Sequence, residues 1–363
     1  MKFRCERDLL VDALNIASKA VTNRGTLPVL HGLRLDLSSN ELVITGSDLD
    51  LTITVSLEVG GEKNGVTVVP AKLLADVVRA VEPGAVDITA EDTNLHVVAG
   101  RSEFSLRTIP KDEYPNFEEP TTSPVTVDGE SLVRALEQVT PAASSDDSRP
   151  ILTGVYMVAE KKGFRLVATD SYRLAVRDMP EASLLEGQPP ILVPSRALTE
   201  LARLIEPNDE VSLHLSDREA SFVVKNVRMT TRLIDGEFPD YQRLVPDSNP
   251  NKLTANRGEL FDAVRRVRLL AQEATPVRLE MSTSGLELIA KTQDIGEAHE
   301  IVDASYSGDE LVIAFNAEYL LKGLEIAPGD EVTLETTDNQ KPAVLKASDH
   351  PEFLYLLMPV RIS

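Results

Sequence analysis

Three segments of the sequence share one form, and the middle one reads Phe164-Arg-Leu-Val-Ala-Thr-Asp-Ser-Tyr-Arg173. Its apolar residues fall at every second position and then give way to a polar turn, which predicts a half-buried strand. The other two segments are Glu41-Leu-Val-Ile-Thr-Gly-Ser-Asp-Leu-Asp50 and Leu286-Glu-Leu-Ile-Ala-Lys-Thr-Gln-Asp294. Their recurrence indicates that the chain contains one structural unit three times.

Further landmarks recur with nearly the same period. Pro28, Pro150 and Pro276 are 122 and 126 residues apart, and each precedes one of the three strand segments. A helical pattern opens at spacings of 124 and 122 residues, in Val69-Pro-Ala-Lys-Leu-Leu, Val193-Pro-Ser-Arg-Ala-Leu and Phe315-Asn-Ala-Glu-Tyr-Leu. Another helical pattern begins each unit, over residues 6–21, 129–139 and 258–271. Each unit is therefore expected to run helix, strands, helix, strands.

This order predicts an α+β fold of three similar domains. Strands outnumber helices and their connections are short, which favours antiparallel sheets with two helices on one side. Polar, proline-rich stretches at 118–123 and 246–251 are plausible linkers. We therefore place the domains at residues 1–120, 121–249 and 250–363.

Composition limits the classes of function. Hydrophobic residues make up 42% of the chain and charged residues 26%, which is ordinary for a globular protein. Apolar runs fall short of the ~20 residues that span a bilayer, and the N-terminal segment is charged and amphipathic, so we expect a cytoplasmic protein. Cys5 is the only cysteine, which excludes an internal disulfide and a cysteine-based zinc cluster. The net charge of −21 argues against a surface coated in nucleic acid but allows a local basic face.

Motifs of catalysis are missing from the sequence. The five histidines are far apart, and neither a phosphate-binding loop, a dinucleotide fingerprint nor a nucleophile elbow occurs. Two close acidic pairs, Asp48 with Asp50 and Asp146 with Asp147, leave open a carboxylate-pair hydrolase. A role in turns is the simpler interpretation of both pairs. A three-domain scaffold that binds peptides but not DNA is a further alternative.

Four longer stretches carry a resemblance to a known family. They are Val167-Ala-Thr-Asp-Ser-Tyr-Arg-Leu-Ala-Val176, Asp235-Gly-Glu-Phe-Pro-Asp-Tyr-Gln-Arg-Leu-Val-Pro246, Phe315-Asn-Ala-Glu-Tyr319 and Tyr355-Leu-Leu-Met-Pro-Val-Arg361. Together they resemble the bacterial DNA polymerase III beta subunit, the replicative sliding clamp, over the whole chain. The resemblance implies a head-to-tail homodimer whose six domains form a ring, with helices inside, sheets outside and duplex DNA passing through.

The resemblance also implies what such a ring does. It performs no chemistry and needs no cofactor or metal. It tethers the catalytic subunit of DNA polymerase III to DNA and so confers processivity, and an ATP-driven clamp loader opens it. Other polymerases, ligase and mismatch-repair proteins would bind through short peptide motifs. It would act in the cytoplasm, at replication forks of the nucleoid.

Two candidate DNA contacts follow from the resemblance. Arg24 matches a DNA-contacting arginine of the family, and Arg149 is the cation in the second contact region. Pro150 and Ile151 stand there in place of tyrosines, so this chain departs from the family pattern.

The resemblance places a peptide pocket between the second and third domains, which would receive leucine and aromatic anchors. Ser171-Tyr172 stands where the family pattern has Gly-His, so peptide preference is expected to differ in detail. The matching residues are Leu152, Thr169, Ser171, Tyr172, Arg173, Leu174, Pro239, Arg243, Leu244, Asn316, Tyr319, Met358, Pro359, Val360 and Arg361.

A dimer interface is implied between the first domain of one protomer and the third domain of the other. Phe104 matches the apolar strand contact, and Leu269 and Leu270 match the opposing helix contact. Arg101 and Glu300 match a charged pair at the rim. Because two different surfaces meet, two such joints would close a ring.

Overall fold

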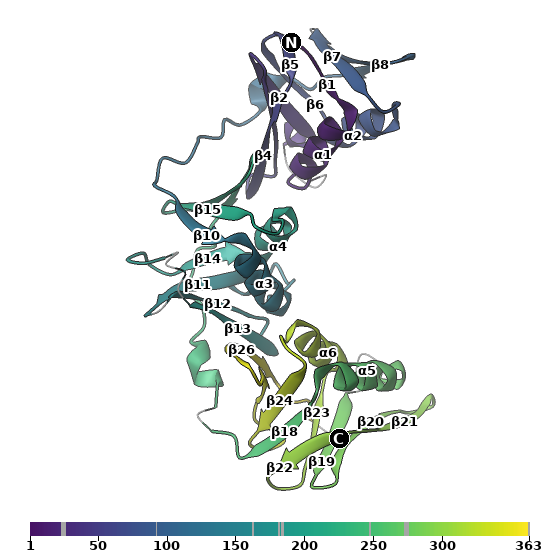
Figure 1. Ribbon diagram of the computed structural model, residues 1–363, viewed down its shortest axis with the longest axis vertical. Coiled ribbons are helices and arrows are strands. Elements are labelled where there is room, and N and C mark those ends of the chain that lie inside the picture. The colour runs from purple at the N-terminus through teal and green to yellow at the C-terminus, as the bar shows by residue number, and fades with distance from the viewer. Residues whose placement is uncertain are drawn as a thin grey trace. The chain divides into compact units, whose positions relative to one another are not determined.

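The structure is a computed structural model that describes residues 1–22, 27–91, 93–161, 163–180, 182, 185–246, 248–271 and 276–361. The chain divides into two compact units, and Figure 1 labels their helices and strands. One contains Met1–Glu130 with Arg203–Leu233, and the other contains Ser131–Ala202 with Ile234–Ser363.

The three predicted repeats are present as three matching series of elements. The first series is β1 (Lys2–Glu6), α1 (Arg7–Ser18), β2 (Gly32–Ser38), β3 (Glu41–Ser47), β4 (Leu51–Glu58), β5 (Gly60–Lys63), β6 (Gly65–Pro70), α2 (Ala71–Ala80), β7 (Ala85–Glu91), β8 (Asn94–Ala99) and β9 (Ser102–Arg107). The second is β10 (Val125–Asp128), α3 (Gly129–Val139), β11 (Gly154–Glu160), β12 (Gly163–Thr169), β13 (Arg173–Pro180), β14 (Ile191–Pro194), α4 (Ser195–Leu204), β15 (Glu210–Leu215), β16 (Glu219–Val224) and β17 (Val227–Arg232).

The third series is β18 (Asn251–Asn256), α5 (Arg257–Val267), β19 (Val277–Ser282), β20 (Gly285–Thr292), β21 (Gly296–Val302), β22 (Ala304–Ser307), β23 (Leu311–Phe315), α6 (Ala317–Ile326), β24 (Glu331–Thr336), β25 (Ala343–Ala347) and β26 (His350–Leu357). Short 3₁₀ helices connect these elements: η1 (Pro28–His31), η2 (Lys111–Glu113), η3 (Thr140–Ala142), η4 (Pro150–Thr153), η5 (Tyr241–Leu244) and η6 (Arg268–Leu270).

The strands form four antiparallel sheets among the described residues, and two of these sheets combine strands of two repeats. In the first unit the orders are β5-β1-β7-β8-β9 and β10-β15-β16-β17-β4-β3-β2-β6. In the second unit they are β14-β11-β12-β13-β26-β25-β24-β18-β22 and β21-β20-β19-β23. Strand β17 of the second repeat thus pairs with β4 of the first, and β26 of the third pairs with β13 of the second. This sharing explains why the compact units do not coincide with the repeats.

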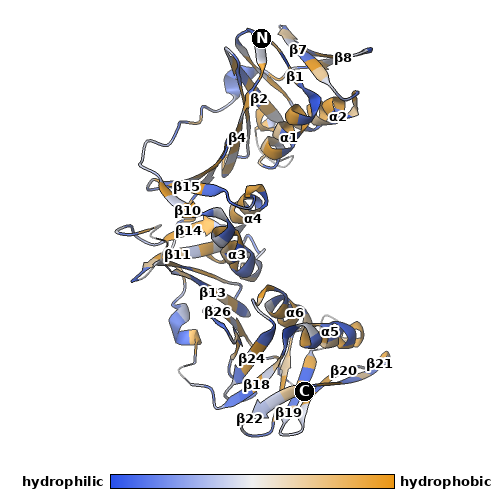
Figure 2. Ribbon diagram, in the orientation of Figure 1, coloured by the Kyte–Doolittle hydropathy of each residue, from blue (hydrophilic) through white to orange (hydrophobic). Residues whose placement is uncertain are grey.

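The helices pack one apolar stripe against the sheets and expose the other side, so hydrophobic and hydrophilic residues alternate along them (Figure 2). In α1 the buried residues are Leu10, Ala13, Leu14 and Ala17, at helical spacing. Asn256 and Asn316 cap α5 and α6, because their side chains accept hydrogen bonds from backbone N–H groups of the first turn. Among the helices of the described ranges, none has the length and apolarity needed to cross a membrane.

Candidate peptide-binding site and joint surfaces

The turn between β12 and β13 is held in place by its own side chains. Asp170 Oδ1 accepts hydrogen bonds from the backbone N–H groups of Tyr172 (2.9 Å) and Arg173 (3.0 Å). Thr169 Oγ1 accepts one from the Ser171 N–H group (3.1 Å) and donates one to the Arg173 carbonyl (2.7 Å). These bonds stabilise Ser171 in the left-handed region, at a φ of 81°.

Two tyrosines and an arginine gather beside this turn. The rings of Tyr172 and Tyr319 stack with their centroids 6.3 Å apart, and the Arg173 guanidinium carbon lies 4.6 Å from the centroid of the Tyr319 ring. Asp170 fixes Arg173 by accepting a hydrogen bond from its Nε (3.0 Å). Asn316 Oδ1 accepts a hydrogen bond from the Tyr319 N–H group (3.3 Å), which sets Tyr319 in the first turn of α6. We call this group of side chains the peptide surface.

The last described residues run along the peptide surface. The Met358 N–H group donates to the Tyr172 carbonyl (2.8 Å), and the Val360 N–H group donates to the Ala314 carbonyl on β23 (2.8 Å). Met358 and Val360 both remain partly exposed, with their apolar side chains available to a ligand. Pro359 lies between them, and Arg361 is exposed.

An apolar cluster lies beneath this region. Val167, Leu174, Val176, Tyr241 and Leu356 are its buried members. Tyr156 stacks on Phe238 with 4.9 Å between centroids, and Tyr241 meets both rings edge-on at 6.4 Å. Leu174 is therefore buried in this cluster and does not form an exposed wall of the predicted pocket.

The remaining predicted pocket residues surround the cluster more loosely. Leu152 is buried in η4. Pro239 and Leu244 are exposed, and the Arg243 Nε pairs with Asp240 (2.7 Å). The Arg243 side chain is thus held by its own segment, and among the described residues it forms no hydrogen bond to the peptide surface.

Burial shapes the protonation of the tyrosines here. It raises the pKa of Tyr319, and deeper burial raises the pKa of Tyr355, whose hydroxyl donates to the Tyr319 carbonyl (3.1 Å). Both hydroxyls therefore stay protonated, so they serve as hydrogen-bond donors.

Comparison with known proteins agrees with this architecture along the full length. The models of the DNA polymerase III beta subunit match in order: the N-terminal domain over residues 1–118, the central domain over 126–240 and the C-terminal domain over 242–361. The beta sliding clamp of Streptomyces coelicolor is 36% identical, with both chains covered completely. This chain belongs to the DNA polymerase III beta subunit family, the bacterial beta sliding clamps.

Solved structures of sliding clamps have the same fold. The clamp of Bacillus subtilis superimposes with a TM-score of 0.95 at 28% identity, covering 100% of each chain. The clamp of Bartonella birtlesii, solved bound to griselimycin, superimposes with a TM-score of 0.95 at 32% identity over 100% of each chain. The three-domain antiparallel fold of this family was thus correctly predicted.

The two candidate DNA contacts of this sliding clamp are Arg24 and Arg149. Arg24 lies outside the described residues. Arg149 precedes η4, and its Nε pairs with Asp146 (3.0 Å). Its Nη1 lies 3.4 Å from the Asp170 carbonyl, so the guanidinium sits beside the turn of the peptide surface. A role of Arg149 in DNA binding stays a prediction.

The acidic pairs act in turns. Asp48 Oδ1 accepts hydrogen bonds from the N–H groups of Asp50 (3.2 Å) and Leu51 (2.8 Å). Asp146 Oδ1 accepts from the Ser148 N–H group (3.0 Å). Both carboxylates satisfy their own backbone, which is the simpler role expected from sequence.

The predicted joint residues lie on or next to the edge strands β9 and β21 and on the 3₁₀ helix η6. Phe104 is on β9 and is 36% exposed, and Leu269 in η6 is 82% exposed. Leu270 is next to Leu269, and its carbonyl accepts a hydrogen bond from Thr292 Oγ1 (2.5 Å) at the end of β20. Strands β9 and β21 each end a sheet without a further neighbour among the residues that the structure describes.

The charged residues of the joint show one contact that sequence did not predict. Arg266 Nε donates to both carboxylate oxygens of Glu300 (3.1 Å each) within the same chain. A pairing of Arg101 with Glu300 across a joint would therefore share a carboxylate that already has a cation. It stays a prediction.

Several residues at these sites escaped sequence reasoning. Asp170 positions the turn, and its signal was the Thr-Asp-Ser-Tyr-Arg pattern itself. Tyr156, Phe238 and Tyr241 form the aromatic stack, but nothing local to any one of them reveals its partners. Ile295, which is 52% exposed on the connection between β20 and β21, adds to the apolar side chains near Leu269.

Proposed function

We propose that two copies of this chain close head to tail into a ring that encircles duplex DNA. The ring tethers the replicative polymerase and repair enzymes through the peptide surface and performs no catalysis. The domains would be residues 1–120, 121–249 and 250–363. DNA, the catalytic subunit of DNA polymerase III, the clamp loader, and peptide motifs of other polymerases, ligase and mismatch-repair proteins are the proposed partners, in the cytoplasm.

One observation carries the ring. The second and third repeats each end in a strand that pairs with a hairpin of the repeat before it, as β17 does with β4 and β26 does with β13. By the same rule, β9 would pair with a hairpin of a preceding repeat, and β21 would pair with the last strand of a following repeat. The third repeat of a second copy would supply the hairpin for β9, and the first repeat of a second copy would supply the strand for β21.

The burial of equivalent residues supports this rule. Met229 on β17 pairs with Ile53, and Tyr355 on β26 pairs with Ala175. Phe104 occupies the equivalent position on β9. It pairs with Val97, which pairs with Ile88. In the same way, Met229 pairs with Phe222, which pairs with Leu213. Met229 is 1% exposed and Tyr355 0%, whereas Phe104 is 36% exposed.

Continuing the registers of the two internal joints places Phe104 opposite Ala298 of a second copy. It also places Glu103 opposite His299. Leu269 and Ile295 would flank the added strand, and their apolar surface would be removed from water. The joint is heterologous, and two of them close a ring.

A ring that slides needs a weak grip on DNA. The cations of the helices are largely offset by neighbouring acids, as in Arg79 with Asp76 (3.2 Å) and Arg265 with Asp262 (3.0 Å). Such pairs weaken the attraction to phosphate, which suits enclosure better than adhesion. The net charge of −21 repels DNA from the remaining surface.

Retention on plasmids tests the proposal. Clamp loaded by a clamp loader is expected to stay on closed circular DNA and to be lost when the circle is cut once. A protein that binds DNA by surface contact would remain on both forms, and a scaffold or hydrolase would remain on neither. Equal retention on circles and linear molecules would reject the ring.

A further inference from the structure

In the first two repeats, a segment of the chain packs across the sheet on the side away from the helices. After β9, Tyr114 covers the first repeat: it is buried with Val29, Leu30 and Val68, and its hydroxyl donates to the Thr45 carbonyl (2.9 Å). After β17, Phe238 and Tyr241 cover the second repeat. We call Tyr114-Pro-Asn-Phe117 and Phe238-Pro-Asp-Tyr241 the cover segments.

In all three repeats, an equivalent backbone hydrogen bond holds the chain segment that follows the last strand against the edge of the sheet. The Ile109 N–H group donates to the Val68 carbonyl (2.8 Å) before the first cover segment, and the Ile234 N–H group donates to the Leu192 carbonyl (2.9 Å) before the second. In the third repeat the Val360 N–H group donates to the Ala314 carbonyl (2.8 Å) at the matching place. The three acceptors hold equivalent positions, because each pairs with the corresponding residue of the adjacent strand: Arg34, Tyr156 and Arg278.

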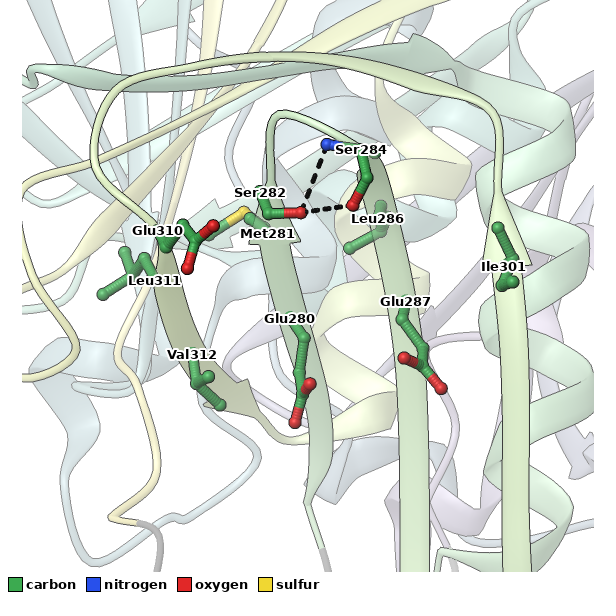
Figure 3. A pocket seen from close by; sticks show the side chains of 11 residues that line it. Glu280, Met281, Ser282, Ser284, Leu286, Glu287, Ile301, Glu310, Leu311 and Val312 are labelled. Atoms are coloured by element: carbon green, nitrogen blue, oxygen red, sulfur yellow. Dashed lines mark hydrogen bonds between the residues drawn. The ribbon is translucent and has the colours of Figure 1, made fainter.

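The matching sheet face of the third repeat has no such cover among the described residues. Instead it has a hollow of about 650 Å³ over β19, β20, β21 and β23, within the ~300–1,000 Å³ range of ligand sites. Pairing registers align Val312, Glu280, Glu287 and Ile301 in one row across the four strands. Figure 3 shows Val312, Glu280 and Glu287 side by side on adjacent strands, with Ile301 on the next. Ile301 is 80% exposed.

The charge of this row is specific to the third repeat. Glu280 and Glu287 face each other across β19 and β20, an arrangement of like charges that destabilises a sheet. The equivalent pairs are Asp36 with Val43 in the first repeat and Val158 with Arg165 in the second. Arg165 is neutralised by Asp178 (2.6 Å), and its Nη1 lies 3.5 Å from the Tyr241 hydroxyl of the cover segment.

The carboxylates of the hollow are poorly compensated. Glu287 bonds to His299 Nδ1 (2.8 Å) on β21. Glu280 and Glu310, which both line the hollow, form no hydrogen bond or ion pair with any residue that the structure describes. A segment that covers this face therefore has to supply cationic side chains as well as an apolar or aromatic one.

We propose that the outer face of β19, β20, β21 and β23 binds an extended segment of a partner protein that combines an aromatic–proline sequence with Lys or Arg. The aromatic residue takes the place that Tyr241 has in the second repeat, over Arg278 and Ile289. The basic residues reach Glu280, Glu287 and Glu310, and the apolar stems lie between Ile301 and Val312. This surface is distinct from the peptide surface and does not depend on the ring.

A labelled peptide of sequence Phe-Pro-Lys-Tyr-Lys-Arg, a basic variant of the second cover segment, tests the proposal by fluorescence polarisation. Binding to the full chain is expected, and Glu280→Lys should weaken it about tenfold because like charges then meet. Asp349→Lys is the matched control: it makes the same charge change at an exposed residue that does not line the hollow, and should have little effect. A peptide with Glu in place of each Lys and Arg should not bind.

Four results would overturn the proposal. The first is the absence of binding of the basic peptide, and the second is equal binding by Glu280→Lys and wild type while both melt alike by circular dichroism. Another is loss of binding when Tyr172 is changed to Asp and Arg173 to Leu, which would assign the peptide to the peptide surface. The last is a change in molar mass on Glu280→Lys by light scattering, which would assign the face to a second copy of this chain.

Discussion

The two internal joints, β4 with β17 and β13 with β26, have the same backbone and different surfaces. In the first, Asp48 accepts hydrogen bonds from the second and third residues after it, as Asp170 does in the second. The Arg232 N–H group donates to the Asp50 carbonyl (2.9 Å), just as the Met358 N–H group donates to the Tyr172 carbonyl (2.8 Å). Leu49 and Ser171 share the left-handed conformation, with φ of 78° and 81°.

What differs is the side chains that this backbone presents. Asp50 and Leu51 stand in the first turn where Tyr172 and Arg173 stand in the second. Within the described part of the chain, the second joint therefore has an aromatic pair with a guanidinium over it and the first does not. The shared backbone makes a joint, and the different side chains give the second joint the features of the proposed peptide surface.

The proposed third joint gives the largest expected effect. Replacing both Leu269 and Leu270 by Asp puts two charges into the apolar part of the joint, which should abolish the dimer while the protomer still folds. Size-exclusion chromatography with light scattering measures the mass, and circular dichroism checks the fold. An intact dimer with both substitutions would show that the joint lies elsewhere.

A pair of alanine substitutions tests whether Phe104 and Met229 are equivalent. Met229→Ala opens a cavity inside a joint that is already filled, so it should lower the free energy of unfolding of the protomer by about 2–5 kcal/mol. Phe104→Ala should leave the protomer nearly as stable and weaken the dimer about ten- to a hundredfold.

Thermal melting in the monomeric Leu269→Asp/Leu270→Asp background measures the first effect, and sedimentation of otherwise unchanged protein measures the second. If Phe104→Ala destabilised the monomer as much as Met229→Ala does, Phe104 would be an ordinary core residue of the first repeat.

Exchanging the turn side chains sharpens the comparison of the internal joints. Tyr172→Asp with Arg173→Leu gives the second turn the side chains of the first. Binding of a labelled peptide with leucine and aromatic anchors should fall about thirtyfold or more, because the aromatic pair and its cation are lost. The fold should survive, since Asp50 and Leu51 already occupy the equivalent positions of the same backbone in the first turn.

Deleting residues 358–363 is a second way to remove the peptide surface and should abolish the same binding. The reverse exchange, Asp50→Tyr with Leu51→Arg, is the matched control and should not create a new peptide site. Undiminished polarisation signals for both the exchange and the deletion would move the peptide site elsewhere.

The repeats were predictable because alternation and helical spacing are local patterns. The helix expected over residues 6–21 forms over Arg7–Ser18, and the one over 129–139 forms over Gly129–Val139. The pairing of β17 with β4 and of β26 with β13 was not predicted, because the sequence pattern of a strand does not identify the strand with which it pairs. Tyr114 and Tyr241 follow the last strands of their repeats, and no local pattern predicts that both are buried.

The local conformation of the candidate site was predictable where a short motif holds the residues together. Thr169 to Leu174 form a turn and a strand start that any copy of the motif would form. Arg149 lies far from that turn in sequence, and only the tertiary fold brings it beside Asp170. Long-range pairings of this kind depend on packing between elements, which no periodicity encodes.

The smallest expected effect concerns His299, on the hairpin of the third repeat. Its equivalents Thr54 and Val176 are buried in the internal joints, whereas His299 is exposed and hydrogen-bonds Glu287 and Glu297. These two carboxylates raise the pKa of His299 above its ordinary value of 6.5. Because the folded pKa is the higher one, the charged histidine stabilises the fold fully below about pH 6.5, and this contribution is lost as pH rises through the folded pKa.

The monomeric Leu269→Asp/Leu270→Asp background isolates this effect from dimerisation. In it, His299→Gln should lower the urea midpoint slightly at about pH 6 and make almost no difference near pH 9, where the imidazole is neutral in both states. His214→Gln is the matched control, because the His214 Nδ1 contacts the Thr122 carbonyl and no carboxylate. A difference between wild type and His299→Gln that grew toward pH 9 would mean that the carboxylates do not hold the imidazolium, and the third hairpin would then differ from the other two for another reason.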